Sequence, residues 1–244
     1  GHLDHTLSVD WVVQSFWRKH RKERRYPIYA TLPVYRFLVQ SFPHLEDLCE
    51  HRELEFGVTM APCKDLPFHL TSYPVYHGQS AVGASMLLFG HGNHRIVFTG
   101  DILAPMLREE DYERLYGADL LVVDTNNRFP WPRTNHWSFA ASPADPLKRS
   151  KTLETFAAEL NWQQLVSPHR QEGISNQNLS YLSMLEKEWN PLEALFSILE
   201  LLKRIKPKQV MLVHYSGAED KRYSGEEILS ADELQDWASE KAMQ

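Results

Sequence analysis

The sequence predicts an α/β fold, a layered sandwich in which strands are flanked by helices. Two observations lead to this prediction. Between residues 54 and 98, short β-type runs alternate with Gly, Pro and Asn, whereas before and after this stretch the apolar residues recur at helical spacing. The chain also contains no internal repeat and no linker long enough to separate domains. Helices that flank a strand cluster bury their apolar faces against it as layers, so we expect one domain over residues 1–244.

The N-terminal part predicts two helices and one strand before the strand cluster begins. Residues 6–19 have apolar side chains at helical spacing, and residues 32–41 form a second helix that tolerates Pro33 in its first turn. Between them, Tyr-Pro-Ile-Tyr-Ala at 26–30 reads as a short strand. The cluster then supplies strands at 54–59, 68–76, 85–89 and 95–98, the last two joined by a His-Gly-Asn-His hairpin turn at 91–94.

The C-terminal part alternates helices with buried strands. Residues 109–116 read as a helix, and the apolar run at 119–124 reads as a buried strand that ends in Asp124. Helices are predicted at 147–160, 179–188, 191–206 and 231–243, with a strand at 209–213. Residues 140–190 form an apparent helical insertion, for which we expect the role of a lid or of a contact in a homodimer.

Composition limits the classes of protein to consider. The chain of 244 residues is 43% hydrophobic and has no apolar run of the roughly 18 residues that cross a bilayer. Its first residues lack the basic and then apolar layout of a signal peptide. Cys49 and Cys63 are too few for a disulfide framework. We therefore expect free thiols, a cytoplasmic protein and no membrane partner.

The charge pattern does not favour nucleic acid as the binding partner. The net charge is −6, and nucleic-acid binding depends on clustered positive charge. One basic run, residues 18–25, interrupts this acidic background with six Lys and Arg side chains. It reads either as a solvated end of a helix or as a lip that attracts phosphate.

Residues that bind metals gather at the start of the chain and at three later positions. His2-Leu-Asp-His5 packs two imidazoles and a carboxylate into one turn, a density of ligands that suits a metal site. Later segments, each following a β-type run, add a His or an Asp. The candidate metal ligands are His2, Asp4, His5, His77, Asp101 and His214.

The order of these motifs resembles that of the metallo-β-lactamase-fold hydrolases. The nearest branch contains the class II cyclic-nucleotide phosphodiesterases and the tRNA 3′-processing endonucleases; Pro74-Val-Tyr-His-Gly and His214-Tyr-Ser carry this resemblance. It implies a four-layer αββα sandwich. In the family, strands and one more His precede the His-Leu-Asp-His motif, and both are missing here. We therefore expect a fragment of a longer protein, which lacks the N-terminal strands of the sandwich.

The resemblance also implies how the ligands divide between two divalent metal ions. One ion would take His2 and His77, together with the His that stands before Gly1 in the family pattern. The other would take Asp4, His5 and His214, and Asp101 would bridge the pair. A His-rich ligand set makes zinc the first expectation, with manganese or iron as alternatives where carboxylates bridge.

Two residues beyond the ligands are candidates for catalysis. Asp124 and His136 are similar to the acidic residue and the His-x-Ser element that phosphodiesterases of this superfamily place beside the leaving oxygen. His136 would then protonate the leaving alkoxide or bind a phosphate oxygen. The other interpretation is structural, with Asp124 ending a strand and His136 in a Pro-rich loop. With Asp4, they complete the set of candidate catalytic residues.

The function predicted from these motifs is metal-dependent hydrolysis by a water that two ions activate. We expect a phosphodiesterase that acts on a cyclic nucleotide or another small nucleotide-type phosphodiester. Three alternatives stay open: a hydrolase of lactones, thioesters or β-lactams at the same metal site, an RNA-processing endonuclease, and a degenerate member that only binds. Metal content and the choice between phosphoryl and carbonyl substrates separate them.

Overall fold

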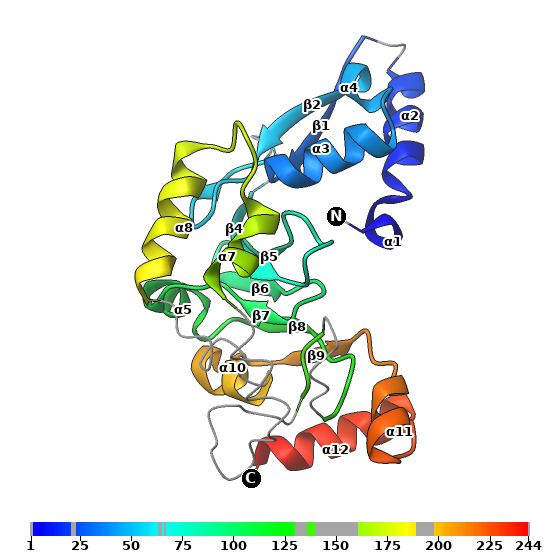
Figure 1. Cartoon of the computed structure of the whole chain (residues 1–244), viewed down its shortest axis with the longest axis vertical. Helices are drawn as coiled ribbons and strands as arrows, with labels where there is room; N and C mark the ends of the chain where they lie inside the picture. The colour runs from blue at the N-terminus through cyan, green and yellow to red at the C-terminus, as the bar shows by residue number, and fades with distance from the viewer. Residues whose placement is uncertain are drawn as a thin grey trace.

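The structure, a computed structural model, describes residues 2–20, 23–62, 65, 67–129, 136–139, 161–188 and 198–243. Its centre is a seven-stranded sheet with a two-stranded sheet beside it (Figure 1). Helices lie before and after a run of consecutive strands, as expected for a layered α/β fold, so the predicted fold class is confirmed.

The central sheet changes from antiparallel to parallel pairing along its strand order β3-β4-β5-β6-β8-β9. The antiparallel part contains β3 (Thr59–Met60), β4 (Phe68–Tyr76), β5 (Ser85–His91) and β6 (His94–Phe98), and β7 (Ala104–Pro105) pairs with the end of β4. β8 (Leu120–Asp124) and β9 (Val210–Val213) then run parallel to β6. The carboxyl ends of parallel strands lie at one edge, where open α/β sheets commonly bind ligands.

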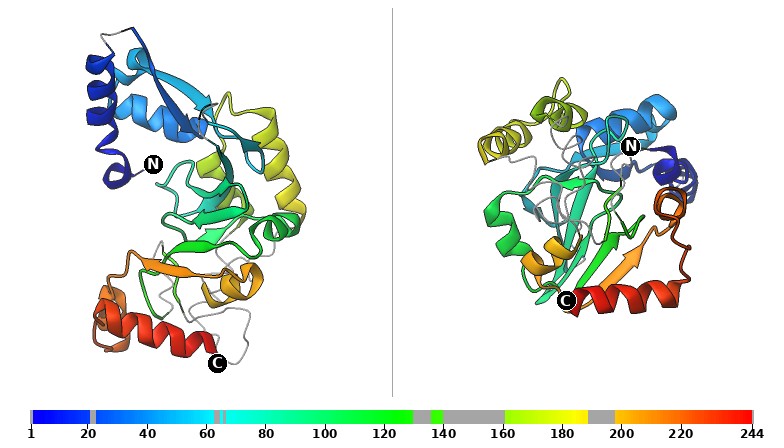
Figure 2. Two further views of the ribbon diagram at one scale, coloured as in Figure 1. Left: turned by 180° about the vertical axis from the view of Figure 1, so that it is seen from behind. Right: turned by 60° about the horizontal axis from the view of Figure 1, so that its bottom comes forward.

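An N-terminal unit precedes this sheet and has a small core of its own (Figure 2). Its elements are α1 (Leu3–Thr6), α2 (Val9–Lys19), β1 (Tyr26–Ala30), α3 (Leu32–Ser41), α4 (Leu45–Leu48) and β2 (Cys49–Glu53). β1 and β2 pair in parallel, so the helices α3 and α4 form the crossover that parallel strands require. The buried residues of its core are Val13, Ile28, Ala30, Leu38, Leu45 and Cys49.

The main core lies between the central sheet and the later helices. Alternate residues of the strands, such as Val97, Leu121 and Val123, are fully buried and pack with residues of the helices. The helices are α5 (Glu109–Leu115), α7 (Trp162–Val166), the 3-10 helix η1 (Ser167–His169), α8 (Asn176–Glu188), α10 (Ile198–Ile205), α11 (Ala218–Ser224) and α12 (Ala231–Met243). No helix among these described residues is long and apolar enough to cross a bilayer.

One row of the sheet leaves apolar side chains in contact with solvent. Phe98 is 42% exposed and Met211 is 51% exposed, and both stand beside Val122 across the paired strands. Ile96, on the same face of β6, is 42% exposed. The buried residues alternate with these along each strand, so the core occupies only one face of this part of the sheet.

Most predicted elements are confirmed, and the differences have local causes. The strand expected at 54–59 is wrong: only Thr59 joins a strand, and Gly57 turns the chain there with a φ of +71°. The helix expected at 6–19 is divided into α1 and α2, with a break at residues 7–8. β2 was not predicted because its residues, Cys-Glu-His-Arg-Glu, carry charges that strands rarely contain.

Some predictions fall partly or wholly outside the described residues. The helix expected at 147–160 does so entirely, and of the helix expected at 191–206 the structure describes α10. Cys63 is outside as well. Cys49 is a free, buried thiol, and burial raises its pKa to about 11, so it stays protonated and unreactive at neutral pH.

His169 provides a test of the packing between η1 and the central sheet. Its Nε2 donates to the carbonyl oxygen of Val75 at 2.9 Å, and burial lowers the pKa of the imidazole from 6.5 to about 4. Between pH 6.5 and 4 the unfolded chain therefore binds a proton that the folded chain does not. We expect the titration of His169 to lower the free energy of unfolding by about 3 kcal/mol as the pH decreases through that window. Above pH 7, His169 should add no pH dependence to the free energy of unfolding.

Urea denaturation of the protein and of its His169→Gln variant between pH 7.5 and 4.5 measures this contribution. Gln keeps a donor for Val75 but does not titrate, so the difference between the two curves should shrink as the pH falls. Parallel curves over the whole range would contradict the assignment of a neutral buried imidazole.

Candidate metal centre

Four of the predicted site residues lie at or just after strand ends, at one edge of the central sheet. Asp101 follows β6 after Gly100, whose φ of +60° turns the chain, and Asp124 is the last residue of β8. His214 follows β9 and itself has a left-handed φ of +63°. His77 follows β4. Non-glycine residues in the left-handed region are uncommon and cluster at functional sites, which agrees with a site at this edge.

Three histidines surround one oxygen of the Asp101 carboxylate. The Oδ2 atom of Asp101 lies 2.8 Å from His5 Nε2, 3.7 Å from His214 Nε2 and 3.8 Å from His77 Nε2. His77 is buried and Asp101 is largely buried, whereas His5 and His214 remain partly open to solvent. Nitrogen atoms that converge on a shared carboxylate oxygen form the kind of cluster that can hold divalent cations.

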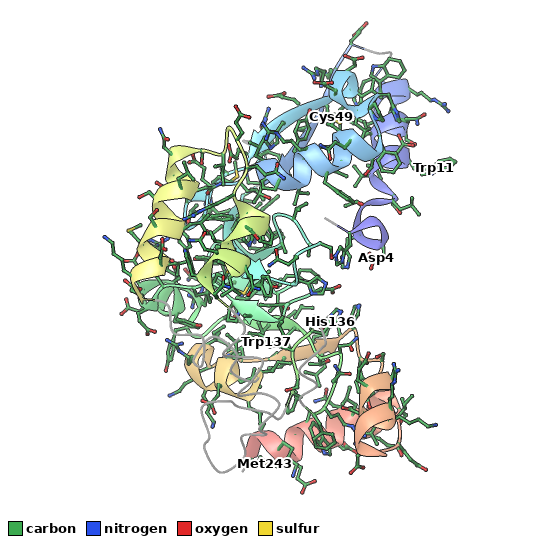
Figure 3. All side chains as sticks on the ribbon, in the orientation of Figure 1. Asp4, Trp11, Cys49, His136, Trp137 and Met243 are labelled. Carbon is green, nitrogen blue, oxygen red and sulfur yellow. The ribbon has the colours of Figure 1, made fainter. Side chains whose placement is uncertain are left out.

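The N-terminal motif reaches this cluster through α1. Asp4 Oδ2 lies 3.3 Å from His5 Nε2, and the Asp4 side chain is 72% exposed. Figure 3 shows Asp4 on α1, close to the N-terminus. His2 packs its ring against that of His77, with 5.1 Å between centroids, while its Nε2 lies 3.1 Å from Ser80 Oγ. Burial lowers the pKa of His2, so its imidazole is a neutral potential ligand.

His136 enters the same cluster, held by a buried carboxylate. Its Nδ1 lies 2.6 Å from Asp124 Oδ2, and its ring contacts those of His77 and His214 at centroid distances of 4.6 and 4.5 Å. Figure 3 shows His136 near the strand ends. Burial lowers the pKa of His136, but the hydrogen bond to Asp124 and the charge of Asp124 outweigh this, and the net pKa is raised.

The Asp124 carboxylate is fixed by its own neighbours. It is fully buried and accepts hydrogen bonds from the backbone N–H groups of Ile102 and Asn126 at 3.0 and 3.1 Å. The hydroxyl of Thr99 in turn accepts the N–H of Asp124 at 3.1 Å. A carboxylate held in this way fixes the imidazole that bonds to it, as the partners of metal-binding histidines commonly do.

Two contacts to the predicted ligands come from residues for which no role was predicted. Asn126 Nδ2 lies 3.0 Å from His214 Nδ1 and donates to the His214 carbonyl at 3.2 Å. Ser80 meets His2, as described above. Asn126 stands two residues after Asp124, and this closeness was the one signal in the sequence.

The ligand atoms fall into three groups, each within 4.8 Å, that could hold a metal ion. The groups are Asp4, His5 and Asp101; His77, Asp101 and His136; and Asp124, His136 and His214. Imidazole and carboxylate donors fit zinc, manganese or iron. The first group agrees with the expected pairing of Asp4 and His5 beside Asp101, whereas His214 lies with Asp124 and His136, and His2 is in none of the three. The division of ligands between two ions stays a prediction.

Among curated proteins, Endoribonuclease YSH1 of Yarrowia lipolytica is 26% identical over 121 residues, which cover 45% of this chain and 14% of that protein. Thus, the chain spans about one seventh of the length of this relative.

A solved structure that superposes with a TM-score above 0.5 shows the same fold. The metallo-beta-lactamase fold protein YhfI from Bacillus subtilis superposes with a TM-score of 0.53 at 13% identity, covering 98% of this chain and 67% of that one. Unliganded yeast PDE1 gives a TM-score of 0.42 at 14% identity, covering 87% and 64%. The family described as the beta-lactamase superfamily domain matches residues 1–157, more than half of the sequence. The chain therefore belongs to the beta-lactamase superfamily.

Proposed function

We propose that this protein is a metal-dependent phosphodiesterase. The observation that carries the proposal is the position of His136: a buried Asp124 holds it 2.6 Å away, and it stands against two predicted metal ligands, His77 and His214. A hydrolase of phosphodiesters with alkoxide leaving groups needs a proton donor beside its metal centre, because an alkoxide leaves poorly without a proton. The superfamily fold itself implies divalent metal ions.

Some residues of the chain would bind the metal ions, and others would position the substrate. His2, Asp4, His5, His77, Asp101 and His214 would hold two divalent ions, most simply zinc, with manganese or iron as alternatives. When bound, such ions supply an activated water and neutralise charge on the phosphoryl group. Asp124 holds Nδ1 of His136, and Nε2 of His136 would donate to the leaving oxygen or to a phosphate oxygen. The Asp4 carboxylate, which is 72% exposed, would be accessible to an incoming water.

The substrate that we propose is a cyclic nucleotide or another small nucleotide-type phosphodiester. RNA is the second candidate, because the curated relative is an endoribonuclease. The net charge of −6 speaks against an extended nucleic-acid surface on this chain. Both candidates require phosphoryl transfer to water, whereas a lactone, thioester or β-lactam hydrolase would use the same ions on a carbonyl.

The test is hydrolysis by the metal-loaded protein in its natural length, with metal content measured on the same samples. Bis(p-nitrophenyl) phosphate is the first substrate, and a lactone, a thioester and a β-lactam are the carbonyl probes. Turnover of the diester with one or two ions per chain supports the proposal. Turnover of a carbonyl substrate alone, or a protein that takes up no metal, would reject it.

His136→Ala separates proton donation from other roles of this residue. Nitrophenolate leaves as a stable anion and needs no proton, whereas the leaving oxygen of adenosine 3′,5′-cyclic phosphate or uridylyl-adenosine does. We expect kcat for alkoxide-leaving substrates to fall by roughly 10²- to 10⁴-fold, and kcat for bis(p-nitrophenyl) phosphate to fall by less than about 10-fold. The metal content should not change. An equal loss on both classes would assign His136 to phosphate binding, and loss of an ion would make it a ligand.

A further inference from the structure

A cavity of about 270 Å³ opens directly beside the candidate metal centre. His2, His5, His77 and Asp101 form one end of it. From there it extends between the N-terminal unit and the central sheet. Its walls include Tyr29 of β1, Val34 of α3 and Leu87 of β5.

The walls of this cavity are short of charge. Apart from the candidate metal ligands, the described residues that line it are apolar or uncharged, and none of them is Lys, Arg or Glu. The polar end of Tyr29 is turned to other partners, since its hydroxyl donates to the Pro62 carbonyl and accepts from Arg52 Nη1 at 2.6 Å. A charged group placed there would lose its hydration without a partner, which costs several kcal/mol.

A close turn fixes the shape of one wall. Gly83 has a φ of +64°, and a side chain at this position would lie 2.4 Å from Thr31 Oγ1 and 2.9 Å from Val34 Cγ2. The Thr31 hydroxyl also donates to the Gly83 carbonyl at 3.1 Å. The first turn of α3 therefore rests on the loop before β5, so the cavity is formed by packed elements on both sides.

The cavity does not include His136, although both border the same candidate metal ligand, His77. Neither His136 nor Asp124 is among the described residues that line the cavity. His77 lines the cavity, and its ring also contacts that of His136. In a phosphodiester, one ester oxygen leaves and the other is retained. If His136 meets the leaving oxygen, the substituent within the cavity is the one on the retained oxygen.

We propose, resting on the phosphodiesterase function above, that this cavity binds the retained ester substituent of the substrate, and that this substituent is uncharged and ring-sized. An apolar cavity of about 150 Å³ is large enough for benzene. A cavity of about 270 Å³ therefore holds one aromatic or nucleobase-sized group. A polynucleotide, which carries a charge at each residue, does not fit. Small diesters with one such substituent are therefore the preferred class.

Two diesters with the same leaving group test this proposal. Bis(p-nitrophenyl) phosphate retains a nitrophenyl group and methyl p-nitrophenyl phosphate retains a methyl group, and both release nitrophenolate. We expect kcat/KM to favour the aryl diester. Leu87→Trp, which narrows the cavity, should reduce this preference for the aryl diester at least about 10-fold.

Phe89→Trp is the matched control, because Phe89 lies two residues along β5 on the same face and does not line the cavity. It should leave the preference unchanged. Val34→Phe narrows the opposite wall and should act like Leu87→Trp, so a folding defect in one variant does not decide the result. Circular dichroism and metal content establish that each variant is folded.

The possible results distinguish the cavity from the proposed function. Hydrolysis of neither diester would reject the phosphodiesterase proposal itself. Hydrolysis of both with no aryl preference, or a preference that Leu87→Trp and Val34→Phe leave intact, would reject the cavity as the binding site while the function stands. A substrate whose retained substituent carries a carboxylate, such as 4-carboxyphenyl p-nitrophenyl phosphate, should be hydrolysed less efficiently than the bis(nitrophenyl) diester, and equal efficiency would contradict an uncharged site.

Discussion

Replacing Asp101 with Asn is expected to reduce metal binding and hydrolysis of bis(p-nitrophenyl) phosphate by at least about 100-fold. Even partners of metal ligands are worth about 10- to 100-fold in affinity or activity, so a carboxylate at the centre of the cluster should matter at least as much. Its Oδ2 atom is the one that His5, His77 and His214 all approach. Asn keeps the shape of the side chain but removes the negative charge that would offset two cations.

Asp119→Asn is the control for Asp101→Asn. Asp119 also follows a turn, but it comes just before β8, at the end of that strand opposite to Asp124, and its carboxylate binds Lys208 and accepts the N–H of Arg95. We expect this variant to keep its metal content and turnover. Elemental analysis and kinetics on both variants give the answer: if Asp101→Asn retained full metal content and activity, Asp101 could not be a bridging ligand.

The residues that the structure brings together at the candidate metal centre were easier to predict from the sequence than the contacts that hold them. His-Leu-Asp-His and the single His or Asp after each β-type run were recognisable because few residue types can bind metals. The ends of parallel strands then bring Asp101, Asp124 and His214 to one edge of the sheet. Asn126 could not be assigned in the same way. An amide that holds His214 satisfies a local hydrogen bond, and many Asn residues do so without any site nearby.

Strands were predicted where apolar residues dominate and missed where pairing alone defines them. The strand Phe68–Tyr76 is apolar for most of its length and was predicted with both ends correct. β2 is polar and forms only because β1 lies beside it in parallel register. A contact between segments that are distant in sequence, like this one, leaves no periodic signal.

The buried charge at Asp111 is another contact of this kind. Its fully buried carboxylate accepts from Arg108 Nε at 3.0 Å, from Arg108 Nη2 at 3.1 Å and from the Tyr181 hydroxyl at 2.6 Å. Tyr181 is on α8, 70 residues further along the chain, so this hydrogen-bond network links α5 to α8. The Arg108 guanidinium also packs on the Tyr181 ring, with its Cζ 4.4 Å from the ring centre.

We expect Asp111→Ala to be the most destabilising single change proposed for this protein. Removing one partner of a buried ion pair leaves the other charge without compensation, which costs about 3–5 kcal/mol. For a chain of this length, such a loss lowers Tm by about 10 °C. Thermal and urea denaturation of the variant, with the wild-type protein beside it, measure both quantities.

Glu110→Ala provides the comparison that isolates burial as the cause. Glu110 pairs with the same guanidinium, its Oε1 lying 2.6 Å from Arg108 Nη1, but its side chain is 59% exposed. Because water screens this pair, its removal should cost less than about 1 kcal/mol. Asp111 and Glu110 thus pair with the same arginine but differ in burial. The difference in free energy of unfolding between the two variants therefore measures how much burial adds to the ion pair. Equal losses in the two variants would mean that Arg108 is solvated in solution and that α5 is not fastened through it.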